Sequence, residues 1–88
     1  MLLFAILGHD DNPKLEAAMA VHFPGNHLRL GKGQWLVAGS NTTVVDVSNI
    51  LGISDGVNGS AIVISIATYY GRANTNIWEW MKVKLSTP

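Results

Sequence analysis

The sequence contains no cysteine and few charged residues. The lack of cysteine excludes disulfide bonds and thiolate metal sites, and it predicts a cytoplasmic protein. Charged residues make up 14% of the 88 residues, well below the usual share of about a quarter. Six basic residues balance six acidic ones, so the basic excess typical of general nucleic-acid binders is missing from the whole chain. A surface with so little charge favours a protein that buries part of its exterior in an assembly.

A membrane-spanning run is also missing. The apolar amino-terminal segment Leu2–Leu7 is followed by Gly8, so it is far shorter than the ~20 residues that cross a bilayer. No basic residues precede this segment and no small-residue cleavage site follows it, so we expect a strand here and not a signal peptide. We therefore expect no membrane partner, and a single domain that covers residues 1–88.

Three runs are apolar at every or nearly every position: Leu2–Leu7, Trp35–Ala38 and Ala61–Ala67. Such runs are typical of strands that are buried on both faces of a sheet. Only two convincing helices lie between them, so the second face of the sheet needs another cover, and we predict a homodimer. The side chains that we assign to the uncovered face are Leu2, Phe4, Ile6 and Leu36.

The two helices begin at recognisable caps. Asn12 followed by proline predicts a helix over residues 13–22, with Asn12 as the N-cap. Thr43 followed three residues later by Asp46 is close to a capping box, and it predicts a second helix over residues 44–51.

The order of elements predicts an α+β fold. Residues 26–30 alternate as a one-sided strand, and Gly31-Lys32-Gly33 predicts a hairpin to the strand that starts at Gln34. The resulting βαββαβ order is that of a ferredoxin-like sandwich. Right-handed crossovers then place the first and third strands in the centre and the second and fourth at the edges. The fourth strand, predicted over residues 61–68, is strongly apolar and lies at an edge of this sheet. Exposed apolar edges tend to pair with other strands, which is a second reason to expect a homodimer.

The carboxyl-terminal segment has two interpretations. Asn76 with Glu79 can cap a short helix, whereas Met81–Leu85 also fits a strand of period two. We expect one or two helical turns from Ile77, passing into an extended end that pairs with a neighbouring chain.

The strongest candidate for chemistry is the cluster His9, Asp10 and Asp11, just after the first strand. Paired carboxylates at a strand end can bind Mg²⁺ or Mn²⁺ through hard oxygen ligands. The alternative is structural: both aspartates shape the turn and favour the start of the next helix electrostatically.

A second candidate is Tyr69-Tyr70-Gly71-Arg72, where two aromatic residues stand beside a cation. This combination can stack on single-stranded nucleic acid and contact its phosphates. In the alternative, one tyrosine packs inward and Arg72 is a solvated loop residue.

Three short motifs resemble the Cas2-like group, which includes VapD-type ribonucleases and the small SinR-family proteins. They are Gln34-Trp35-Leu36-Val37 after the hairpin, the helix that starts at Thr43, and the tail Trp78-Glu79-Trp80-Met81-Lys82. The resemblance implies a ferredoxin-like homodimer. Some members of the group cleave RNA or DNA with a divalent metal and others only act as scaffolds, and the acid of the group would fall on Asp10 or Asp11.

Two functional hypotheses follow. In the first, the chain is a metal-dependent nuclease or a nucleic-acid-binding dimer: Asp10 or Asp11 holds Mg²⁺ or Mn²⁺, His9 shuttles protons, and Tyr70, Arg72 and Lys32 contact nucleic acid. In the second, the chain is a non-enzymatic structural or protein-interaction dimer, and these residues only shape turns. The neutral charge and the lack of a catalytic pair favour the second, and the resemblance favours the first.

Overall fold

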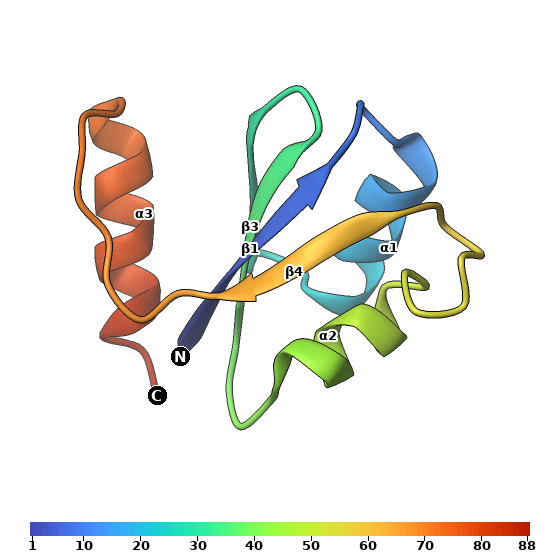
Figure 1. The fold of residues 1–88 in the computed structure, drawn as a ribbon. Coiled ribbons are helices and arrows are strands. Elements are labelled where there is room, and N and C mark those ends of the chain that lie inside the picture. The colour runs from blue at the N-terminus through green and yellow to red at the C-terminus, as the bar shows by residue number, and fades with distance from the viewer.

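The structure is a computed structural model that describes all 88 residues, folded as a four-stranded sheet with three helices (Figure 1). The elements in chain order are β1 (Leu2–Gly8), α1 (Pro13–His22), β2 (His27–Gly31), β3 (Gln34–Gly39), α2 (Val44–Ile50), β4 (Ala61–Ser65) and α3 (Thr75–Leu85).

The sheet is antiparallel throughout, with the strand order β2-β3-β1-β4. In the middle of the sheet, Phe4 of β1 lies opposite Val37 of β3 on one side and Ser65 of β4 on the other. Strands β1 and β3 are central and β2 and β4 are at the edges, where the sequence places them. The α+β class is confirmed. β4 ends at Ser65, three residues before the predicted end, Thr68.

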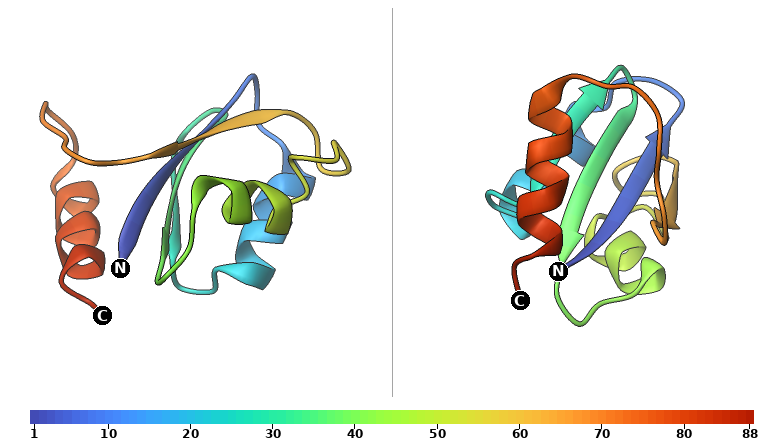
Figure 2. Two further views of the ribbon diagram at one scale, coloured as in Figure 1. Left: turned by 60° about the horizontal axis from the view of Figure 1, so that its bottom comes forward. Right: turned by 90° about the vertical axis from the view of Figure 1, so that its left-hand side faces the viewer.

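Helices α1 and α2 cover one face of the sheet (Figure 2), and both start at the predicted caps. The side chain of Asn12 accepts a hydrogen bond from the backbone N–H of Leu15 at 3.1 Å. At α2, Thr43 and Asp46 form a reciprocal capping box, in which each side chain accepts from the backbone N–H of the other. The larger hydrophobic core lies between these helices and the sheet, and its buried residues are Phe4, Ile6, Leu15, Met19, Phe23, Trp35, Val37, Val47 and Leu51.

Helix α3 covers part of the opposite face, beside β1 and β3 (Figures 1 and 2). The tail is therefore a helix of 11 residues, and the predicted extended end is wrong. Asn74 is the N-cap in place of the predicted Asn76, and its side chain makes no capping hydrogen bond. A second, smaller core lies under this helix, and its buried residues are Leu3, Leu36, Ala38 and Met81.

The prediction of an uncovered sheet face is wrong in two respects: which side chains lie on that face, and what covers it. Phe4 and Ile6 belong to the core under α1 and α2, whereas Leu36 lies on the other face, under α3. Both faces of β1 are apolar, so the alternation of side chains could not show which face meets which helix. The face of the sheet opposite α1 and α2 is called the reverse face below. Much of it is covered by the chain's own carboxyl-terminal helix, α3, without a partner.

The end of α3 is attached to the start of β1. The amino group of Met1 donates hydrogen bonds to the carbonyls of Lys84, at 3.1 Å, and Thr87. The hydroxyl of Ser40 donates to the carbonyl of Pro88 at 3.1 Å. These contacts fix the register of the helix on the sheet. None of the three helices has the length and apolar character that a membrane crossing requires.

Candidate functional site

The turn after β1 brings Asp11 against the hairpin that joins β2 and β3. One carboxylate oxygen of Asp11 accepts a hydrogen bond from the backbone N–H of Gly33 at 3.0 Å. The other oxygen accepts from the guanidinium of Arg29 at 2.8 Å, in an ion pair. Both oxygens therefore accept hydrogen bonds from within the chain, and these bonds connect the turn to the hairpin.

These partners also change the acidity of Asp11. The hydrogen bond from the Gly33 N–H lowers the pKa of this carboxyl below its usual value, and the hydrogen bond from Arg29 lowers it further. Both stabilise the ionised form. A general acid needs a raised pKa near neutral pH, so the shift runs against that role.

Asp10 is also engaged within the turn. One of its carboxylate oxygens accepts from the backbone N–H of Asp11 at 2.7 Å, in a local turn hydrogen bond. The same oxygen lies 3.4 Å from the ammonium of Lys32, the residue at the tip of the hairpin. Because both side chains are mostly exposed, this pair is weak. It nevertheless places a carboxylate beside the cation that was predicted to contact phosphate.

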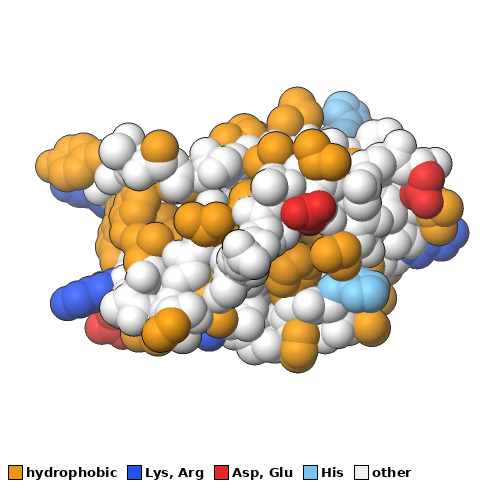
Figure 3. All heavy atoms as spheres, turned by 90° about the horizontal axis from the view of Figure 1, so that it is seen from below, with side chains coloured by type: hydrophobic (Ala, Val, Ile, Leu, Met, Phe, Trp, Pro, Cys, Tyr) orange, Lys and Arg blue, Asp and Glu red, His pale blue; other side chains and the backbone are white.

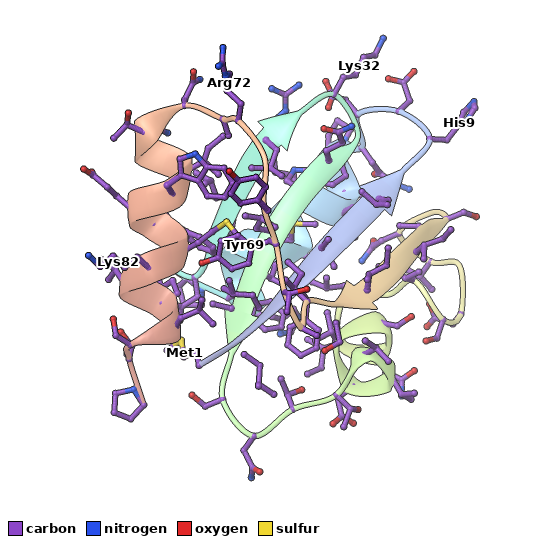
Figure 4. The ribbon with its side chains drawn as sticks, turned by 60° about the vertical axis from the view of Figure 1, so that its left-hand side comes forward. Met1, His9, Lys32, Tyr69, Arg72 and Lys82 are labelled. Atoms are coloured by element: carbon purple, nitrogen blue, oxygen red, sulfur yellow. The ribbon has the colours of Figure 1, made fainter.

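His9 does not complete a site with the two aspartates. It is exposed and makes no hydrogen bond within the chain. His9, Lys32 and Arg72 project from the same end of the molecule toward solvent and do not converge (Figure 4). The ring of His9, the predicted proton shuttle, is therefore not held by another group of the chain.

A divalent metal does not fit this cluster as it stands. Mg²⁺ binds through oxygen ligands in near-ideal octahedral geometry. Both oxygens of Asp11 already bind Gly33 and Arg29, and one oxygen of Asp10 faces Asp11 and Lys32. No group of three or more histidine, aspartate, glutamate or cysteine side chains lies close enough together to hold an ion. A metal would have to displace the ion pair with Arg29.

The segment between β4 and α3 places its two tyrosines differently. Tyr69 stacks on Trp78 of α3, with ring centroids 5.7 Å apart and planes 14° apart. Tyr70 is fully exposed, and Arg72 is exposed two residues later. Tyr69 therefore packs against α3 while 42% of its area stays exposed. Tyr70 and Arg72 are free to contact a partner.

The most distinctive surface is at β4. Ile62 and Ile64 expose 64% and 42% of their area, and the neighbouring Leu7 of β1 exposes 41%. In the pairing of β1 with β4, Leu7 lies opposite Ile62 and Ala5 lies opposite Ile64. These side chains therefore lie on the same face of the sheet, the one that α3 partly covers. We call Leu7, Ile62 and Ile64 the β4 strip. An open hollow of about 400 Å³ adjoins it, lined in part by Leu7, His9 and Ile62.

A second hollow, of about 590 Å³, opens between the end of α1 and the start of α2. It was not predicted, because its polar lining residues lie at the ends of separate elements and form no sequence motif. Its lining residues include Asn26, Asn41, Asn49, Phe23 and Ala38. Figure 3 shows the lower face of the molecule, where hydrophobic and uncharged side chains dominate and charged groups are scattered. No nucleophile paired with a base is present in this hollow.

No protein-family model, no curated protein and no solved structure matches this chain.

Proposed function

We propose that the chain is a homodimeric, ferredoxin-like protein of the Cas2-like kind that serves as a non-enzymatic interaction module. The observation that carries this proposal is the exposed apolar β4 strip, in which Ile62 and Ile64 belong to the edge strand β4 and Leu7 to its neighbour β1. Long hydrophobic edges pair with other strands unless charges, prolines or other elements protect them. The chain has none of these protections at β4.

The ferredoxin-like assignment is supported by the element order and by the sheet. The chain runs β-α-β-β-α-β before α3, and the sheet is antiparallel with β1 and β3 in its centre. Both features are those of a split βαβ arrangement. The Cas2-like assignment is narrower, and it is supported by the short motifs at Gln34–Val37, Thr43 and Trp78–Lys82.

The geometry of the acidic turn favours interaction over catalysis. Asp11 is held by Arg29 and Gly33, and Asp10 lies beside Lys32. These contacts explain both aspartates as parts of a turn that is fastened to a hairpin. They also place a carboxylate beside Arg29 and beside Lys32, two of the cations near this turn.

Sedimentation equilibrium over a range of protein concentrations tests the dimer. We expect a monomer–dimer equilibrium that responds weakly to added salt, because apolar burial and not charge drives it. A monomer at every concentration would overturn the proposal.

Incubation of RNA and DNA with Mg²⁺ or Mn²⁺ tests the non-enzymatic role. We expect no cleavage by the wild type or by the Asp10→Ala/Asp11→Ala double variant. Cleavage that requires both aspartates would contradict our proposal and support the nuclease hypothesis. Cleavage that survives the double variant would point to a contaminant or to another site.

A second candidate function is binding of single-stranded nucleic acid, and the full exposure of Tyr70 beside Arg72 is the observation that favours it. An exposed ring offers a stacking platform worth about 1–3 kcal/mol per base, and the arginine can contact a phosphate. Fluorescence anisotropy with labelled oligonucleotides at low salt tests this function. Tyr70→Ala should weaken binding about tenfold, whereas Tyr69→Phe, which keeps the stacked ring, should leave binding unchanged.

A further inference from the structure

The hydrogen-bond pattern of the sheet defines which backbone groups of β4 are free. The N–H of Ile66 donates to the carbonyl of Leu3 at 3.0 Å, so this opposed pair is a directly bonded one. Bonded and non-bonded pairs alternate along an antiparallel ladder. The even residues of β4 therefore direct their N–H and C=O groups to β1, and the odd residues, Ala61, Val63 and Ser65, direct theirs to the open edge.

These outward groups have no partner within the chain. No backbone or side-chain hydrogen bond outside the strand ladders involves Ala61, Val63 or Ser65. β4 is the last strand in the order β2-β3-β1-β4, so no further strand lies beside it. The edge presents alternating donors and acceptors to solvent.

The sequence around β4 does not repel a second copy. No charged residue, histidine or proline lies between Asp55 and Arg72. Lysine, proline and inward-pointing charges are the usual devices that protect an edge strand. Two copies of this segment can thus approach without like-charge repulsion.

We propose that two copies of the chain pair antiparallel through β4, with Val63 at the two-fold axis. This inference rests on the proposed homodimer and specifies how it is built. A two-fold axis at Val63 places Val63 opposite its own copy, and Ala61 opposite Ser65 of the partner. All the outward N–H and C=O groups of the odd residues then form directly bonded pairs, and the two sheets become one continuous sheet.

The same register joins the exposed isoleucines. Ile62 of each copy lies opposite Ile64 of the partner, in a non-bonded pair whose Cα atoms are about 4.5 Å apart. Their side chains lie on the α3 face, where Ile62 and Ile64 are now in contact with water. Pairing gathers both isoleucines of each copy into one apolar cluster.

Cysteine cross-linking tests the register directly, because the native chain has no cysteine. Ile62→Cys and Ile64→Cys chains, one of them isotope-labelled, are mixed under mild oxidation, and disulfides are identified by mass spectrometry. We expect the mixed disulfide, which joins one variant to the other, to exceed either disulfide between identical variants about tenfold. The reason is that opposed Cα atoms at about 4.5 Å are in bonding range and diagonal ones at about 7–8 Å are not. Thermal unfolding of each reduced variant verifies that it folds.

Other outcomes separate the register from the dimer. A dominant disulfide between two Ile62→Cys chains would place the axis at position 62 and overturn our register. A dominant disulfide between two Ile64→Cys chains would place the axis at position 64, with the same consequence. A dimer that yields no disulfide in any combination would overturn β4 pairing and leave the proposed dimer intact. A monomer at every concentration would overturn both.

A charge at the edge provides an independent readout. Ile62→Lys should raise the dimer dissociation constant at least about tenfold, because the ammonium would enter the apolar cluster. Val21→Lys is the matched control: Val21 exposes 71% of its area on α1, away from β4, and its substitution should leave the constant unchanged. Equal effects of the two variants would overturn the inference.

Discussion

The guanidinium of Arg29 and the carboxylate of Asp11 lie 2.8 Å apart, so the turn after β1 is attached to β2. The second oxygen of Asp11 accepts from the Gly33 N–H, which attaches the same turn to the hairpin. A single carboxylate therefore joins segments that are about twenty residues apart in the chain. Asp11, one of the two aspartates predicted to bind a metal, thus has a structural role in joining the turn to the hairpin.

The stability of the fold should depend on the ionisation of Asp11. Its folded-state pKa is lowered, so the stabilisation it provides is present above its ordinary pKa of 3.8 and is lost as the pH falls through the folded value. Asp11→Asn should lower the free energy of unfolding at neutral pH, and the difference from the wild type should shrink as the pH falls below 3.8. Urea unfolding at a series of pH values measures this difference.

Glu79→Gln is the control for Asp11→Asn. Glu79 is exposed on α3, and its side chain takes part in no ion pair or hydrogen bond within the chain. Its neutralisation should leave the pH profile unchanged. If the two variants had the same pH profile, the fastening role of Asp11 would be wrong.

Gly33 should tolerate no side chain. Its φ is +71°, and an added Cβ would lie 3.0 Å from the carbonyl oxygen of Gly8 and 3.2 Å from the backbone nitrogen of Asp10. Gly33→Ala should destabilise the fold by about 2–4 kcal/mol, from the left-handed backbone and from this backbone crowding. Gly56→Ala is the control with a φ of +76° but open space around it, and it should cost only about 1 kcal/mol. Chemical denaturation distinguishes the two, and equal losses would show that crowding is unimportant.

Local signals in the sequence were enough to predict the centre of the fold. The Asn12 cap, the Thr43 capping box and the hairpin at Gly31–Gly33 each depend on residues a few positions apart. Their order, with right-handed crossovers, then determined which strands are central. These predictions needed no knowledge of distant contacts.

The cover of the reverse face and the role of the acidic turn depend on distant contacts. Met81 packs with Leu3 and Leu36, which lie far from it in the chain, and the spacing of apolar residues in the tail does not specify these partners. Likewise, Asp11 meets Arg29 and Gly33 only after the hairpin folds back. A turn aspartate with these partners has the same sequence pattern as a metal ligand, so the sequence alone does not reveal these contacts.

The capping box at α2 should contribute measurably to stability. A helix start leaves about four N–H groups without an intrahelical acceptor, and the capping box satisfies two of them at α2. Thr43→Ala removes the side chain that accepts from Asp46 N–H at 3.2 Å, and it should cost about 1 kcal/mol. Thr68→Ala, at an exposed threonine without a hydrogen bond, should stay within about 0.5 kcal/mol of the wild type. Thermal unfolding of both variants provides the comparison, and a neutral Thr43→Ala would contradict it.

Met81 tests whether α3 covers the sheet as part of the same cooperative fold. Its side chain is 5% exposed between α3 and the strands, with Leu3, Leu36 and Ala38 as neighbours. Met81→Ala should leave a cavity and lower the free energy of unfolding by about 2–4 kcal/mol. Val83→Ala, at a position on the same helix that is 58% exposed, should change it by less than about 0.5 kcal/mol. Equal, small effects in urea unfolding would mean that α3 does not cover the reverse face in solution. The sheet would then need a partner chain over Leu3 and Leu36 as well as at the β4 edge.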